Sequence, residues 1–163
     1  MGDETSSAFA KVDLFAKMGD ETLAGLDALG EDAAYEAGVH IFDQGVALES
    51  GQAILHVITA GEATVQINDK DRASLYPDDY FGEVTLFDLA VPTATIIAGP
   101  DGLQARTLSR SSDLTALLGN PDFSEKLVLA FCARLRDLDL YDVAWAALWG
   151  HVPVRGHEGR VVE

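Results

Sequence analysis

Short apolar segments separated by glycine-containing turns occupy the chain from Tyr35 to Leu75. Each segment is only a few residues long and is rich in β-branched or aromatic side chains, which is typical of strands. Even spacing of such segments favours a small antiparallel barrel or jelly roll. The predicted strands are Tyr35–Ala37, Val39–Phe42, Ile54–Thr59, Ala63–Ile67 and Arg72–Leu75, broken at Gly38, Asp43–Gly45, Gly51, Gly61 and Asn68–Asp69.

Two later strands, at Thr95–Ile97 and Leu103–Leu108, would close this barrel through a turn at Gly99–Gly102. Amphipathic patterns predict helices on both sides of it. Two short helices are expected between Lys11 and Leu29, the second capped by Asp20 and ended by Gly30. The fold class is therefore mainly β with flanking helices: an antiparallel β jelly-roll barrel, short N-terminal helices and a long C-terminal helix.

The C-terminal part begins with a short helix at Asp113–Leu118, for which the preceding serines offer a cap. Asn120 and Pro121 are a cap and a first-turn proline, so a second helix is predicted to run from there to Trp149. We expect four regions along the chain: a flexible N-terminus at 1–10, a barrel domain at 11–119, the C-terminal helix at 120–149 and a flexible tail at 150–163.

Length and charge limit the classes of function. A chain of 163 residues is long enough for one sizeable core, and the single cysteine, Cys132, excludes an internal disulfide. The formal net charge of −16 opposes direct binding of nucleic acid, although it is equally explained by adaptation to salt or by solubility. The chain shows no apolar run of membrane-spanning length and no signal-peptide pattern, so we expect a cytoplasmic protein without membrane contact.

The segment Phe81–Ala98, FGEVTLFDLAVPTATIIA, has the layout of an anion-binding loop. Gly82 follows a turn at Tyr76–Asp79 and allows a close approach of the backbone. The N–H groups of Val84, Thr85 and Leu86 would start a short helix, whose positive end favours a phosphate. Glu83 beside them is suited to accept hydrogen bonds from a sugar hydroxyl.

This segment resembles the cyclic-nucleotide-binding domain family, which includes catabolite-activator-type regulators and the regulatory subunits of cyclic-AMP-dependent kinase. The family's phosphate-binding cassette reads approximately F-G-E-L-A-L, a short loop and P-R-x-A-T-V-x-A, and the chain aligns with it without a gap. The resemblance implies a ligand site made of Gly82, Glu83, Val84, Thr85, Thr93, Ala94 and Thr95. It also implies a possible ligand, cyclic AMP or cyclic GMP, and no other cofactor.

The chain departs from that cassette at one decisive position. Val91-Pro92 stands where the family has Pro-Arg, so the arginine that pairs with the cyclic phosphate is replaced by Pro92, which has neither charge nor donor. Of the arginines that could substitute, Arg72, Arg106 and Arg110 are each expected to be solvated surface residues.

The long helix suggests how the domain assembles. Its apolar stripe has Leu127, Phe131, Leu138, Trp145 and Leu148 at helical spacings. The resemblance implies pairing with a second copy through this helix, whereas the alternative is that the stripe lies back on the barrel. The residues from His151 onward are too few for a helix-turn-helix, so we expect the sensor half alone, with a protein effector as a further candidate partner.

No other chemistry is indicated. His40, His56, His151 and His157 do not show metal-ligand spacing, and His56 is expected to be a hydrogen-bonded core or rim residue. Most of the candidate carboxylates belong to turns, so no enzyme and no metal site is predicted. Two functions stay open: a ligand-sensing regulatory domain with weak or lost cyclic AMP binding, or a degenerate binding fold acting as a protein-interaction or dimerisation module without a nucleotide.

Overall fold

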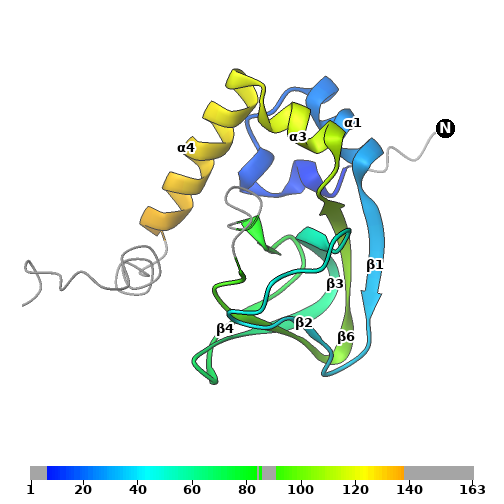
Figure 1. Ribbon diagram of the computed structural model, residues 1–163, viewed down its shortest axis with the longest axis vertical. Coiled ribbons are helices and arrows are strands. Elements are labelled where there is room, and N and C mark those ends of the chain that lie inside the picture. The colour runs from blue at the N-terminus through cyan, green and yellow to red at the C-terminus, as the bar shows by residue number, and fades with distance from the viewer. Residues whose placement is uncertain (1–6, 84, 86–90, 138–163) are drawn as a thin grey trace, which may run out of the picture. The chain divides into compact units, whose positions relative to one another are not determined.

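Two long antiparallel strands form the centre of the structure, β3 (Ala53–Ile67) and β6 (Thr95–Ser109). The computed structural model describes residues 7–83, 85 and 91–137. Within them the sheet order is β1-β6-β3-β4, with β2 beside β6 and β5 beside β3, and every pair is antiparallel. Figure 1 shows these strands wrapping into a barrel, with helices α1 and α3 at one end. The predicted antiparallel jelly-roll barrel is confirmed.

The shorter strands are β1 (Glu31–Tyr35), β2 (His40–Phe42), β4 (Lys70–Leu75) and β5 (Tyr80–Phe81). The predicted strand at Tyr35–Ala37 is wrong in position, because β1 ends at Tyr35 and begins in a polar stretch. Its side chains are largely exposed, so the apolar pattern that marks buried strands is absent from it. Strand β5 was not predicted, since two residues are too few to show a period.

The predicted chain breaks at Gly61 and at Gly99–Gly102 are wrong. Both positions lie inside continuous strands, and the register of β3 with β6 shifts on either side of Gly61. Gly61 and Gly102 have φ values of +81° and +79°, and a Cβ on Gly61 would collide with the Gly102 carbonyl oxygen. The two glycines therefore mark a bend where the strands touch, and not a turn that ends them.

The N-terminal helices differ from the prediction. Two 3-10 turns, η1 (Phe9–Lys11) and η2 (Asp13–Phe15), precede helix α1 (Asp20–Leu29) in place of a first α-helix. Gly19, and not Asp20, is the N-cap of α1, whereas Gly30 ends it as expected. Phe9 is 0% exposed, so the packed structure begins before the predicted boundary at residue 11.

The C-terminal helices begin at the predicted caps. Helix α3 (Ser112–Leu118) starts after Ser111, whose Oγ accepts a hydrogen bond of 3.1 Å from the Leu114 N–H. Asn120 Oδ1 accepts from two N–H groups in the first turn of α4 (Pro121–Asp137). The rest of the predicted helix, to Trp149, and the predicted tail lie outside the described residues.

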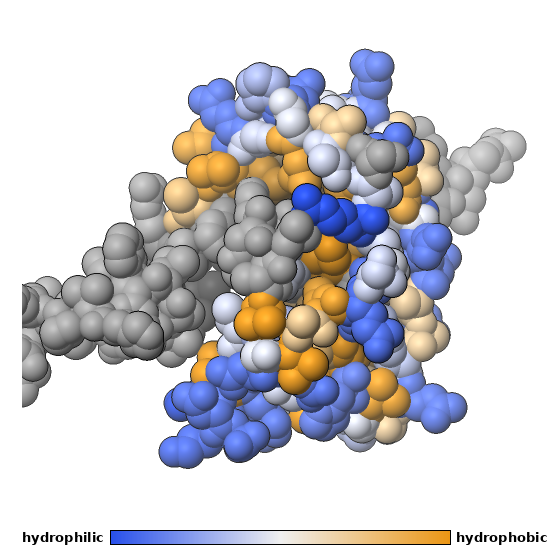
Figure 2. All heavy atoms as spheres, viewed as in Figure 1, coloured by the Kyte–Doolittle hydropathy of each residue, from blue (hydrophilic) through white to orange (hydrophobic). Residues whose placement is uncertain are grey.

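The chain divides into two compact units, Met1–Ala130 and Phe131–Glu163. In the first, one core cluster packs the N-terminal turns and the helices against β3 and β6, and a second fills the barrel. Hydrophilic residues gather over the end formed by β2 and β4 on the face shown in Figure 2, in keeping with the exposure of β4. None of the described helices is both long and apolar enough to cross a bilayer.

Arg106 ties helix α1 to the barrel, and the expectation of a solvated surface arginine is wrong for it. Its Nη2 donates to the Asp27 carbonyl oxygen at 2.7 Å, and its Nη1 donates to Asp32 at 3.2 Å. The side chain is only 24% exposed, and a Cβ on Gly30 would come within 2.8 Å of its Nε. A strand residue thus satisfies a carbonyl at the end of α1, which removes it from any role as a substitute phosphate ligand.

We predict that Arg106→Met lowers the free energy of unfolding by about 1–2 kcal/mol, because the Asp27 carbonyl loses a charged donor in a half-buried position. Urea unfolding followed by circular dichroism measures the change. Arg72→Met is the matched control, since Arg72 is exposed on β4, and it should leave stability within about 0.5 kcal/mol of wild type. Equal effects of the two substitutions would show that Arg106 does not hold the helix to the barrel.

Candidate functional site

The turn before the site is held by backbone hydrogen bonds to strand β3. The Asp78 N–H donates to the Ile58 carbonyl and the Ile58 N–H donates to the Asp79 carbonyl, both at 2.9 Å. Asp78 adopts φ +72°, a left-handed conformation that aspartate tolerates better than most residues. The chain then enters β5, where Phe81 lies opposite His56. This pairing sets where Gly82 emerges from the barrel.

The backbone at Gly82 makes a close approach, as the sequence predicted, but it approaches other residues of the protein and not a ligand. It has φ +89°, and a Cβ there would overlap the Ile54 carbonyl oxygen and come within 3.1 Å of the Phe42 ring. Any side chain would push β5 away from β3, so glycine is required at this position on both grounds. Gly82 therefore packs against the Ile54 carbonyl and the ring of Phe42, and we call these two groups the seat of the predicted anion loop.

Helical backbone follows Gly82 directly, at Glu83 and Thr85. Thr85 is 3% exposed, and its Oγ1 donates to the Gly82 carbonyl at 2.8 Å. Its hydroxyl therefore closes the first turn, while Glu83 is half-buried at the start of that turn. Val84, a predicted ligand residue, lies outside the described residues, as do positions 86–90.

We call residues 81–85 the first arm of the predicted cassette and residues 91–95 the second arm. The second arm is attached to the turn after β2. The Pro92 carbonyl accepts from the Gly45 N–H at 2.9 Å, and Thr95 Oγ1 accepts from the Gln44 N–H at the same distance. Pro92 is buried, whereas Thr93 is exposed to solvent. Ala94 packs against the barrel core. The family position of the arginine is thus filled by a buried apolar ring.

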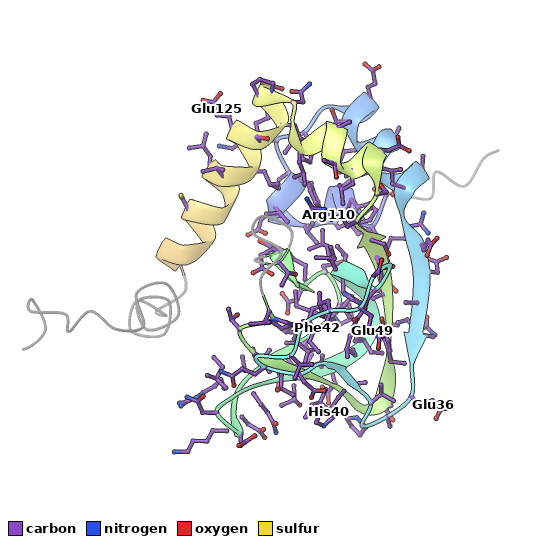
Figure 3. The ribbon with its side chains drawn as sticks, in the orientation of Figure 1. Glu36, His40, Phe42, Glu49, Arg110 and Glu125 are labelled. Carbon is purple, nitrogen blue, oxygen red and sulfur yellow. The ribbon has the colours of Figure 1, made fainter. Side chains whose placement is uncertain are left out.

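Phe42 connects the two arms. Its ring lies against Gly82 of the first arm, and its backbone pairs with Ile96, the residue after Thr95 in the second. Figure 3 shows Phe42 within the barrel, in contrast to Glu36, which points away from it. Sequence reasoning missed this role, because an aromatic residue in a strand is an ordinary core residue by pattern alone.

His56 lies in an aromatic cluster beneath the first arm. Its ring stacks on Phe81 with a centroid distance of 4.6 Å and meets the Phe42 ring edge-on at 5.4 Å. The Tyr35 hydroxyl is 2.8 Å from Nε2, and Nδ1 is 3.3 Å from the Ile54 carbonyl oxygen. A carbonyl can only accept, so Nδ1 carries the proton and Nε2 accepts from Tyr35. The prediction of a hydrogen-bonded core histidine is confirmed.

Burial lowers the pKa of His56 from 6.5 to about 4, even though the hydrogen bond to Ile54 acts in the opposite direction. Burial also raises the pKa of the Tyr35 hydroxyl. Both groups are therefore neutral at pH 7, and the pair joins β1 to β3 without a buried charge. The same Ile54 carbonyl oxygen serves His56 and forms the seat of Gly82.

This arrangement makes the domain less stable in acid. Between pH 6.5 and about 4 the unfolded chain binds a proton at His56 that the folded chain does not, so stability falls as the pH falls through this range. We predict that wild type loses about 2 kcal/mol more than His56→Gln between pH 7.5 and pH 5. Urea unfolding at the two pH values measures this difference.

His40→Gln is the control for that experiment, because the His40 side chain is exposed and hydrogen-bonded to Asp43 on the surface. It should keep the steep pH dependence of wild type. A His56→Gln protein that loses stability in acid as steeply as wild type would contradict the buried neutral state of His56.

Two of the arginines considered as substitutes remain exposed, as predicted: Arg72 on β4 and Arg110 after β6, labelled in Figure 3. The described part of the site can therefore offer an anion the exposed Thr93, and a helical turn begins after Gly82. The described part of both arms comes together around Phe42, and the position that should carry a cation is a buried proline.

We compared the chain with known proteins by sequence and by fold. No protein-family model matches the chain. Cyclic-GMP-dependent protein kinase egl-4 of Caenorhabditis briggsae is 33% identical over 123 residues, which cover 72% of this chain and 16% of the kinase. The same kinase of Caenorhabditis elegans is 29% identical over 136 residues, 76% of this chain and 17% of the kinase. The chain thus spans about a sixth of the length of these curated relatives.

Solved structures share the fold. The N-terminal domain of a transcriptional regulator from Streptomyces coelicolor A3(2) has a TM-score of 0.64 and 27% identity, covering 80% of this chain and 91% of that one. A putative cyclic nucleotide-binding protein from Geobacter metallireducens GS-15 has a TM-score of 0.64 and 18% identity, covering 81% and 96%. Catabolite activator protein from Thermus thermophilus has a TM-score of 0.63 and 24% identity, covering 82% and 63%.

Proposed function

Because the chain belongs by its fold to the cyclic-nucleotide-binding domain family, we propose that it is a regulatory sensor domain with weakened binding of cyclic AMP. The first arm of its cassette has the required glycine and a helix start after it. The second arm has a proline where the family's arginine neutralises the phosphate. These features support a binding site that has kept its shape and lost its strongest contact.

The buried Pro92 is the observation that carries the proposal. A charge-assisted contact is worth about 1.5–3 kcal/mol, so its absence weakens binding roughly ten- to a hundredfold without removing the amide donors. Arg106 cannot compensate, because its guanidinium is bonded to Asp27 and Asp32 at the end of α1. Calorimetric titration of the wild-type protein with cyclic AMP and with cyclic GMP tests the proposal, and a dissociation constant in the low micromolar range or below would contradict it.

Cyclic GMP, which the cassette already implies as a possible ligand, is also suggested by the relatives. The curated relatives are named as cyclic-GMP-dependent kinases, so the two titrations also decide which purine the site prefers. The downstream effector is proposed to be a protein, since the net charge of −16 repels nucleic acid over most of the surface.

We predict that Pro92→Arg raises affinity for cyclic AMP roughly ten- to a hundredfold over wild type. The substitution restores the cation at the aligned position, and the Pro92 carbonyl bond to Gly45 involves only backbone and can persist. Side-by-side calorimetric titration of both proteins measures the gain.

Pro92→Gln is the matched control, because it removes the buried ring and adds donors without adding charge. It should bind no more than a few times better than wild type. A folded Pro92→Arg protein with no gain in affinity would show that the pocket is closed for another reason than the missing cation.

A second candidate function is a protein-interaction or dimerisation module, and helix α4 favours it. Leu127 is buried in the core, yet the neighbouring Val128 and Leu129 are 49% and 55% exposed. An exposed apolar pair beside a buried residue on one helix is a surface that a partner could cover. Pairing of the C-terminal helix predicted at 120–149 with a second copy, at Phe131, Leu138 and Trp145, remains a proposal, and those side chains lie outside the described residues.

We predict that the protein is a dimer in solution and that Trp145→Ala dissociates it, because truncating a buried aromatic costs about 3–5 kcal/mol. Light scattering across a dilution series measures the mass of each protein. Leu140→Ala, which truncates an apolar side chain on the opposite side of the predicted helix, should stay dimeric. A monomeric wild type would show that the stripe packs on its own barrel.

A further inference from the structure

Gln44 lies where three separate parts of the barrel meet. It belongs to the turn after β2, its side chain reaches the β3–β4 hairpin at Asn68, and its backbone reaches the second arm of the cassette at Thr95. Figure 1 shows β2 and β4 together at the end of the barrel opposite the helices. None of these contacts is local in the sequence, so Gln44 joins segments that the chain brings together only on folding.

Both the oxygen and the nitrogen of the Gln44 side-chain amide form hydrogen bonds. Its Oε1 accepts from the Asn68 N–H at 2.8 Å, and its Nε2 donates to Asn68 Oδ1 at 3.3 Å. This two-point contact fixes the orientation of the side chain, since a single hydrogen bond would leave it free to rotate. Asn68 itself sits at φ +53° in the hairpin turn, a conformation that the contact helps to hold.

The backbone of the same turn holds the cassette. The Gln44 N–H donates to Thr95 Oγ1 at 2.9 Å, and the next N–H, of Gly45, donates to the Pro92 carbonyl at 2.9 Å. The turn is closed by a bond from the Val46 N–H to the Asp43 carbonyl, with Gly45 at φ +76°. Two successive donors thus point at the second arm while the side chain between them is anchored on the hairpin.

We infer that Gln44 is a positioning residue, the centre of a latch that sets the second arm of the cassette against the barrel. Its anchor on Asn68 orients the turn, and the oriented turn supplies the two amides that hold Pro92 and Thr95. The Thr95 hydroxyl oxygen accepts in this contact, so its O–H can still donate a hydrogen bond to another group. The role of the latch in ligand binding rests on the proposed function, whereas the latch itself does not.

Hydrogen exchange measured by NMR on the full chain tests whether the latch acts as a unit. In Gln44→Ala the Gly45 amide keeps its own donor and its Pro92 acceptor, so a purely local effect would leave its exchange rate unchanged. A latch predicts that this amide exchanges roughly two- to tenfold faster, because the turn has lost its anchor. Gln44→Glu keeps the acceptor for the Asn68 N–H and should recover part of the protection.

Gln52→Ala is the matched control. Gln52 precedes β3 in the same connection, and its amide bonds to Glu49 and to the Ile41 carbonyl without touching the cassette. It should leave the exchange of the Gly45 amide at the wild-type rate. Faster exchange at Asn68 alone in Gln44→Ala, or equal acceleration throughout the barrel, would overturn the latch.

Titration with cyclic AMP up to millimolar concentration, followed by amide shifts, adds the functional test. Gln44→Ala should weaken binding roughly two- to tenfold relative to wild type and to Gln52→Ala. Unchanged affinity in Gln44→Ala would overturn its role in positioning the site. A wild-type protein whose amides do not shift would overturn ligand binding as the proposed function, and hydrogen exchange would still decide the latch.

Discussion

The barrel depends on the place where β3 and β6 bend together, at Gly61 and Gly102. A Cβ on Gly61 would overlap the Gly102 carbonyl, and a Cβ on Gly102 would come within 2.7 Å of the Tyr35 carbonyl. Before the bend, β3 contributes Ile54, Leu55 and Val57 to the core under the helices; from Ile58 onward it contributes to the core of the barrel. One bent pair of strands therefore builds both cores, and three backbones must meet closely for that to happen.

The sequence could predict the parts of the fold that depend on neighbours along the chain. The caps at Ser111 and Asn120, the end of α1 at Gly30 and the barrel class all come from local chemistry, and all are present. Glycine is ambiguous by comparison, because a turn and a tight bend both require positive φ. The breaks predicted at Gly61 and Gly99–Gly102 were wrong for this reason: what distinguishes a bend from a turn is the opposing strand, which the local pattern does not contain.

The prediction of the site was incomplete for the same reason, because it missed contacts between residues that are distant in sequence. The sequence identified Gly82 and the missing arginine at Pro92, yet the surface that Gly82 approaches is Ile54 and Phe42, more than twenty residues away. Arg106 was predicted to be a surface residue, because the sequence around it gives no sign that it contacts the distant carbonyl of Asp27. Gln44 gave no signal at all, because a polar residue in a turn is explained without any long-range role.

The seat of Gly82 has a consequence for how such a domain can change. The nearest part of that seat is a main-chain oxygen of Ile54, and exchanging one side chain for another at position 54 leaves the oxygen where it is. The second arm is held differently, because its attachments include the Thr95 hydroxyl, the Gln44 amide and whichever residue stands at position 92. Point substitution can therefore alter the attachments of the second arm more readily than the main-chain contact under Gly82.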